Sequence, residues 1–209
     1  MKKLLLIVLG LCLSAGLVQA GTHTYGWEDG GTVLGFYGTN DDESDIMFVS
    51  ATGSPDPVHS GSGSLKIEDN MTDGTPQAFV VFVWGLQFGD TVTGSFWRYD
   101  TTPSAAPSSR IWGHWNDDLP DDYFGYSGSA SGQNDYGPGT GWDQATFDWT
   151  TMSHSGLVIE CRTYSSPGDI VYIDDLEVTI PDHASIMMPS ASFVGTDDTS
   201  FGSVKALFR

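Results

Sequence analysis

Residues with β-branched or aromatic side chains recur in short runs along the chain, and clusters of glycine, aspartate, serine and proline separate the runs. No helical period runs through residues 21–181, so the pattern predicts an all-β fold. Strands are expected at residues 78–84, 91–100, 110–115, 144–150, 157–164 and 170–180, with shorter ones at 45–50 and 64–68. Seven or eight strands without intervening helices favour two antiparallel sheets packed face to face in a jelly-roll sandwich.

The strand expected at 110–115 alternates between two kinds of side chain, and successive side chains of a strand point to opposite faces. One face carries groups suited to contact a ligand: Arg110, Trp112, His114 and, directly after the strand, Asn116. The other carries groups suited to a core: Ile111, Gly113 and Trp115. We therefore predict a ligand face and a core face for this strand.

The strand expected at 91–100 leaves its orientation open. One face carries Thr93, Ser95, Trp97 and Tyr99, the other carries Val92, Gly94, Phe96 and Arg98, and either set could point inward. In the strand expected at 144–150, alternation places three residues on one half-buried face: Ala145, Phe147 and Trp149. We interpret Trp142, shortly before them, as structural as well.

Aromatic residues are concentrated in the middle of the chain, where five of the seven tryptophans lie between residues 84 and 142. Flat aromatic rings stack on the apolar faces of sugar rings, while nearby Asp, Asn, Gln and Arg side chains hydrogen-bond the sugar hydroxyls. For any single tryptophan a place in the core is the commoner role. Four residues are our candidates for ligand binding: Trp97, Tyr99, Trp112 and His114.

The chain begins with features typical of a secretory signal peptide: Lys2 and Lys3, an uncharged stretch at 4–13, and a small-residue pattern that ends at Ala20. We expect cleavage after Ala20 and an extracellular protein, secreted or associated with a cell surface. The expected organisation is a signal peptide at 1–20, a sandwich domain at 21–181 and a C-terminal tail at 182–209.

The excess of acidic over basic residues limits the kinds of partner that this protein is expected to bind. The chain has 27 acidic and 8 basic residues, for a formal net charge of −19. Such a surface disfavours nucleic acid and anionic membranes as partners, and no second apolar segment suggests membrane insertion of the mature chain. Cys161 is the one cysteine after the signal peptide, so no internal disulfide is expected.

Motifs of common hydrolases are missing from the sequence, since neither GxSxG nor HExxH occurs. The five histidines lack the spacing of zinc ligands. Glu43-Ser44-Asp45 begins the paired-carboxylate pattern of a glycosidase strand, but no glutamate completes it. We therefore expect no enzymatic activity and assign no catalytic residue.

Several segments, in this order, resemble the galactose-binding-like jelly-roll carbohydrate-binding modules: GWEDG at 26–30, HSGSGSLKI at 59–67, GDTVTGSFW at 89–97, GW at 141–142 and VYIDDLEV at 171–178. The resemblance extends over residues 26–180. It implies a non-catalytic domain whose partner is a polysaccharide or glycoconjugate.

The same resemblance implies a structural calcium ion away from the sugar site. Its ligands would be the carbonyl of Gly26, the carboxylate of Glu28, a carbonyl within 61–64 for which Ser62 is our candidate, and Asp174. Asp175 is a possible substitute, because alternation puts only one of two adjacent side chains on the metal side. Clustered oxygens suit this hard cation. The alternative is that these acids only cap turns.

Modules of this family are usually appended to enzymes, whereas this chain carries the tail at 182–209 instead. A second hypothesis is therefore a structural or adhesive protein of the cell envelope, in which the tail contacts an envelope or sorting partner. A polysaccharide-cleaving enzyme is the third.

Overall fold

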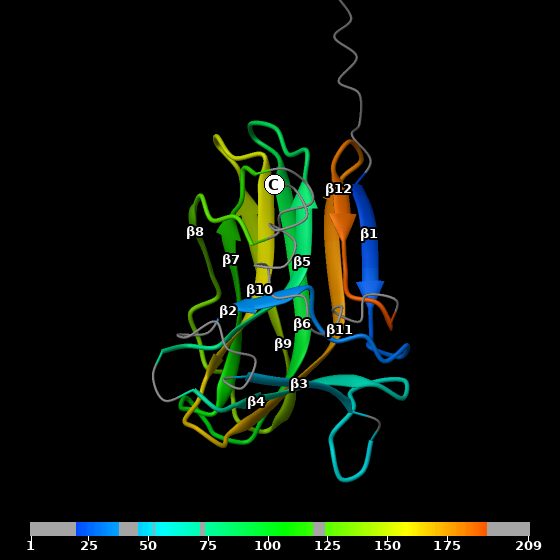
Figure 1. The fold of residues 1–209 in the computed structure, drawn as a ribbon, viewed down its shortest axis with the longest axis vertical. Coiled ribbons are helices and arrows are strands. Elements are labelled where there is room, and N and C mark those ends of the chain that lie inside the picture. Colours follow the sequence, from blue (N-terminus) through cyan, green and yellow to red (C-terminus); the bar gives the residue numbers. More distant parts are fainter. Residues whose placement is uncertain (1–19, 38–45, 52, 72–73, 119–123, 192–209) are drawn as a thin grey trace, which may run out of the picture.

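The computed structural model describes residues 20–37, 46–51, 53–71, 74–118 and 124–191, which form a sandwich of two β-sheets (Figure 1). Residues 1–19 of the predicted signal peptide (1–20) and residues 192–209 of the predicted tail (182–209) lie outside the described residues. Within the described ranges, no helix is long and apolar enough to cross a membrane. The strands are β1 (Ala20–Tyr25), β2 (Gly35–Tyr37), β3 (Ile46–Ala51), β4 (Ser64–Asp69), β5 (Gln77–Trp84), β6 (Thr91–Asp100), β7 (Ser108–Trp115), β8 (Gly128–Gly132), β9 (Gly141–Thr150), β10 (Gly156–Tyr164), β11 (Ile170–Pro181) and β12 (Ser185–Met187).

Both sheets are antiparallel. Sheet A has the order β3-β4-β11-β6-β9, and β1 pairs with the second half of β11. Sheet B has the order β12-β5-β10-β7-β8, and β2 pairs with the first half of β5. From β4 to β12 the chain changes sheets at every connection except the β7–β8 hairpin. This wiring confirms the predicted all-β jelly-roll sandwich.

All eight predicted strands are present, with ends that differ by up to three residues. Four further strands were not predicted: β1, β2, β8 and β12. Two of them, β2 and β12, have only three residues, and β8 has the sequence GSASG, so these three lack the longer runs of β-branched and aromatic residues that predict a strand. Because β12 pairs with β5, the sandwich extends to at least Met187 and the expected boundary at residue 181 is too early.

The core lies between the sheets around Trp149, which is buried. Glycines on two other strands make room for its indole ring: a Cβ on either Gly94 or Gly113 would approach the ring to 3.0 Å. The indole Nε1 donates to the carbonyl of Ser131 at 3.0 Å. Ile111 and Ala145 are fully buried in the same cluster, which confirms the predicted core faces of β7 and β9.

Candidate functional site

The four predicted ligand-binding residues lie on opposite outer surfaces of the sandwich. On β6, Val92 and Phe96 belong to the core, so Trp97 and Tyr99 point away from sheet A. On β7, Ile111 belongs to the core, so Trp112 and His114 point away from sheet B. Two tryptophans separated by the whole sandwich do not contact the same ligand, and the four residues therefore divide into two candidate faces.

The outer face of sheet A carries aromatic rings that pack on one another. The imidazole of His59 stacks on the ring of Trp97, with centroids 3.9 Å apart and an interplanar angle of 15°. Trp142 contacts His59 and Tyr99 edge-on, with each pair of centroids 5.4 Å apart. Trp142 thus lies in this outer cluster, next to the predicted candidates, and not with the inward set of β9. Because His59 stacks on Trp97, that side of the indole is not available to a sugar ring.

The outer face of sheet B, hereafter face B, is arranged in rows across neighbouring strands. One row pairs Tyr37, Gln77, Arg162 and Arg110 in register across β2, β5, β10 and β7. The next row contains Phe79, Glu160 and Trp112, and a third contains Phe82, Val158 and His114. Face B therefore combines aromatic rings with charged and amide groups over four strands.

A fully buried carboxylate lies at the centre of face B. Oε1 of Glu160 lies 2.8 Å from Nδ1 of His114, and Oε2 accepts a hydrogen bond from Nε of Arg162 at 3.1 Å. A buried charge is costly unless it is paired and hydrogen-bonded, and both oxygens of Glu160 have such partners. The Arg162 guanidinium lies over the ring of Trp112, 4.6 Å from its centroid. These contacts fix the orientation of the polar groups relative to the indole.

Open aromatic surface surrounds this polar cluster. The ring of Tyr126 lies 5.5 Å from that of His114 and is 67% exposed, and Phe124 packs edge-on against Phe79 while remaining 44% exposed. Tyr37, at the end of the first row, is 49% exposed. Rings held at one edge and open to solvent are suited to stack on a ligand.

The sequence predicted an outward ligand face with Trp112 and His114, but Glu160 and Arg162 on the same face were not among the candidates. Alternation along β10 was sufficient to find them, since Leu157, Ile159 and Cys161 are the inward set. The contributions of Phe124 and Tyr126 could not be found in this way, because they lie in a loop segment before β8 and no periodicity specifies their direction.

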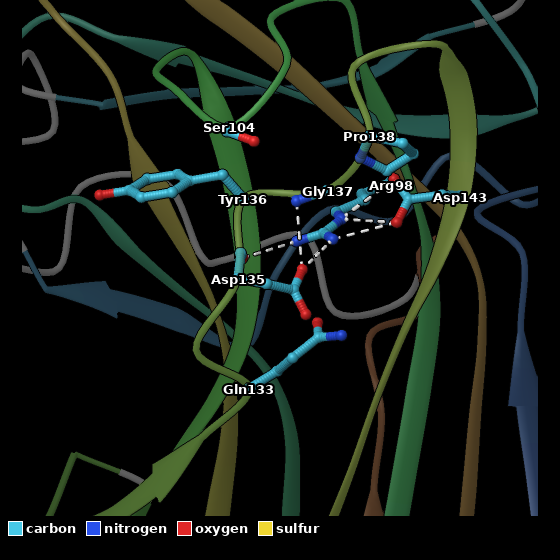
Figure 2. Close-up of a pocket in the computed structure, with 8 residues that line it drawn as sticks. All are labelled: Arg98, Ser104, Gln133, Asp135, Tyr136, Gly137, Pro138 and Asp143. Carbon is cyan, nitrogen blue, oxygen red and sulfur yellow. Dashed lines mark hydrogen bonds and ion pairs between the residues drawn. The ribbon is translucent and has the colours of Figure 1, made fainter.

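A cavity of about 500 Å³ lies at another edge of the sandwich, between the loop after β6, the loop before β9 and the start of β9 (Figure 2). Its lining residues are Arg98, Ser104, Gln133, Asp135, Tyr136, Gly137, Pro138 and Asp143. Figure 2 shows the two aspartates on either side of the Arg98 guanidinium. Nη2 of Arg98 lies 2.6 Å from Asp135 Oδ1 and 3.0 Å from Asp143 Oδ2.

The guanidinium in this cavity has no donor to spare. Nε of Arg98 also donates to Asp143, and Nη1 donates to the backbone carbonyls of Ser109 and Asp135. Burial lowers the pKa of Arg98, but the hydrogen bonds and charges of Asp143 and Asp135 more than offset it, so the pKa lies above its ordinary value. Because all five N–H donors have acceptors, we interpret Arg98 as an ionic link that ties β6 to β9 and to the loop before β9.

The residues expected to hold calcium lie close together. A Cβ on Gly26 would be 3.7 Å from Oε1 of Glu28 and 3.8 Å from Oδ1 of both Asp174 and Asp175. Oxygens of three carboxylates therefore lie within van der Waals distance of one position beside Gly26. Backbone N–H groups of His59 and Ser60 donate to Oδ2 of Asp174.

Both adjacent aspartates approach Gly26 because β11 is irregular at this point. The register with β6 shifts between Asp174 and Glu177, and Asp175 has a φ of 45° in the left-handed region. Strict alternation would have sent one of the two carboxylates away from Gly26, and the bulge removes that restriction. Sequence gives no signal for such a bulge.

In this group of carboxylates around Gly26, hereafter the Gly26 cradle, the pKa values of Asp174 and Glu28 are shifted in opposite directions. Burial raises the pKa of Asp174, and backbone hydrogen bonds only partly oppose it. The pKa of Glu28 is lowered, because the hydroxyl and backbone N–H of Ser62 donate to it. Ser62 therefore contacts Glu28 through its donors, and the expected role of its carbonyl as a calcium ligand stays a prediction. Within the part of the chain that the structure describes, no three His, Cys, Asp or Glu side chains are grouped as preformed metal ligands.

Comparison with protein-family models finds no match, and neither does comparison with curated proteins. Solved structures with similar folds include the xylan-binding CBM22-1 domain of Xyn10C from Paenibacillus barcinonensis, at 11% identity and a TM-score of 0.49, covering 76% of this chain and 93% of that one. The K1 cleaved adhesin domain of Lys-gingipain from Porphyromonas gingivalis has 14% identity and a TM-score of 0.49, covering 76% and 97%. The C-terminal family 22 carbohydrate-binding module of Clostridium thermocellum Xyn10B has 13% identity and a TM-score of 0.44, covering 73% and 92%. Carbohydrate-binding modules and adhesin domains are thus among the structures that this jelly-roll sandwich is similar to, and matches at this level specify no ligand for it.

Proposed function

We propose that this protein is a secreted, non-catalytic carbohydrate-binding protein and that face B is its binding surface. The observation that carries the proposal is the combination of solvent-exposed rings with a fixed polar cluster. Tyr126 lies against His114, whose imidazole shares Glu160 with Arg162, and Phe124 packs on the neighbouring Phe79. Sugars are recognised by this pairing of apolar ring faces with positioned hydrogen-bonding groups.

Face B is favoured over the outer face of sheet A because of what covers each tryptophan. On sheet A, Trp97 is stacked against His59, and Trp142 packs on the same imidazole. On face B the group over Trp112 is the guanidinium of Arg162, which can itself donate to sugar oxygens. On face B, Arg162 therefore adds hydrogen-bond donors beside Trp112. On the outer face of sheet A, His59 occupies the side of Trp97 on which a sugar would stack.

We further propose a structural calcium ion at the Gly26 cradle, held by the Gly26 carbonyl, Glu28 and Asp174, with Asp175 beside them. The supporting observation is the convergence of three carboxylate oxygens on the position next to Gly26. Calcium prefers such oxygen ligands and, when bound, would neutralise carboxylates that otherwise repel one another. The ion would join the turn after β1 to β11 and take no part in sugar binding.

Affinity electrophoresis against a panel of soluble neutral and acidic polysaccharides tests the proposed function. The intact mature protein is expected to be retarded by at least one polysaccharide. Tyr126→Ala should weaken the retardation, whereas Phe88→Ala should leave it unchanged, because Phe88 is also an exposed aromatic residue, at 76%, but lies in the β5–β6 loop. Normal mobility in every gel would overturn the proposal.

A further inference from the structure

Cationic side chains are scarce in this protein, and two of them face each other. The described residues include four Lys and Arg residues, which are Lys66, Arg98, Arg110 and Arg162. Arg110 on β7 and Arg162 on β10 are direct cross-strand partners on face B. Like charges placed directly opposite each other destabilise a sheet, so this pair costs stability in a chain that has 27 acidic residues and only 8 basic ones.

The charge of Arg110 is not neutralised by any carboxylate in the described ranges. Its Nη1 donates to the amide oxygen of Asn134 at 2.8 Å, and its guanidinium lies over the rings of Tyr136 and Tyr164, 3.9 and 4.3 Å from their centroids. Arg110 is only 8% exposed, and its Nε is buried with no hydrogen-bond partner. Arg98, which is 1% exposed, has two aspartates as partners. A buried cation without a counter-charge is a costly arrangement that an anionic ligand would relieve.

Arg162 has donors available beside this unneutralised charge. Its Nε is used by Glu160, while its terminal nitrogens make no hydrogen bond to the described residues. Its side chain is 21% exposed, so it can be reached from solvent. Across the Arg110, Arg162 and Glu160 group, two guanidinium charges face one carboxylate. The excess positive charge lies next to Trp112, in the row that continues to Gln77 and the exposed Tyr37.

We propose that face B binds an acidic glycan, with the sugar's anionic group, a carboxylate or a sulfate ester, held at Arg162 and Arg110. This inference rests on the proposed function and names its substrate class. A guanidinium presents donors in a planar fork that matches the oxygens of carboxylate and sulfate groups. Trp112 and the flanking rings would contact the sugar itself, so the anion gives selectivity and the rings give affinity.

Titration calorimetry with three oligosaccharides of similar length tests this inference on the intact mature protein: an oligogalacturonate, a sulfated oligogalactan and a neutral oligogalactan. At least one acidic oligosaccharide should bind about tenfold or more tightly than the neutral one, the effect of a charged hydrogen bond. Comparison of the oligogalacturonate with the sulfated oligogalactan shows whether a carboxylate or a sulfate ester is preferred. Arg162→Gln should remove this preference, and Arg162→Lys should keep part of it.

Lys66→Gln is the matched control, because it removes one positive charge from sheet A, where Lys66 pairs with Asp56 at 3.4 Å. It should leave the preference for the acidic ligand unchanged. Equal affinity of the native protein for neutral and acidic oligosaccharides would overturn the inference and leave the proposed function standing, and this result does not depend on how any variant folds. If no glycan, neutral or acidic, binds the native protein, the proposed function fails together with the inference.

Discussion

Glu160 and His114 are joined across β10 and β7 by a hydrogen bond of 2.8 Å on the outer side of sheet B, and Glu160 is fully buried there. The bond lies outside the core yet is screened from water by the aromatic residues around it. Such a pair specifies the register of two central strands and also supplies the polar floor of the proposed binding face.

Removal of this carboxylate should reduce stability. Glu160→Ala leaves His114 and Arg162 without their shared acceptor, which should lower the free energy of unfolding by about 3 kcal/mol. Urea denaturation measures the change, and Glu177→Ala, an exposed glutamate on β11, should change it by less than about 0.5 kcal/mol. Equal effects of the two substitutions would contradict the burial and pairing of Glu160.

The ionic link at Arg98 gives a second stability prediction. Arg98→Met removes the charge that joins Asp143 and Asp135. Because removal of the buried guanidinium leaves its acceptors unpaired, the free energy of unfolding should fall by about 3 kcal/mol or more. Lys66→Met removes a partly exposed ion pair and should cost less than about 1 kcal/mol in the same denaturation experiment. An Arg98→Met protein as stable as the native one would show that the link is not structural.

Calcium should raise the melting temperature, and chelation should lower it. At a calcium concentration 100 times Kd the ion would add about 2.7 kcal/mol. Asp175→Asn should reduce this gain, because it removes a negative charge beside the ion, and should change the melting temperature in chelator little, because Ser60 Oγ and His59 Nδ1 can accept as well as donate. Identical melting curves with calcium and with chelator would contradict the proposed calcium site.

The raised pKa of Asp174 sets the pH dependence of that gain. In chelator the folded protein holds this proton more tightly than the unfolded chain, so the carboxyl's contribution to stability falls as the pH rises through the raised pKa. Calcium requires the ionised form, so its stabilising effect should grow over the same acidic range. Melting temperatures measured from about pH 4 to pH 7 with and without calcium should therefore diverge as the pH rises.

The single thiol of the domain should be unreactive in the folded state. Cys161 is fully buried, and burial raises the pKa of its thiol to about 12, so the reactive thiolate is almost absent at neutral pH. A thiol reagent should leave Cys161 unmodified in the native protein and should modify it after unfolding in urea. Rapid labelling of the native protein would contradict the packing of β10 in the core.

Alternation predicted much of this structure because it follows directly from strand geometry. It assigned Ile111 and Trp149 to the core and Trp112 to an outer face correctly. It could not say that Trp97 and Trp112 belong to different sheets, since the pattern within one strand carries no information about which strands pair. The bulge at Asp175 and the short strand β12 were missed for a related reason, because both depend on tertiary pairing and not on local pattern.

The central claim is that face B, and not the outer face of sheet A, binds carbohydrate. Calorimetric titration of Trp112→Ala and Trp97→Ala with the polysaccharide that binds the native protein most tightly tests it directly. We expect Trp112→Ala to weaken binding by about tenfold, equivalent to about 1.4 kcal/mol, and Trp97→Ala to leave the affinity unchanged. Loss of binding in Trp97→Ala with native affinity in Trp112→Ala would place the site on the opposite face and contradict the account.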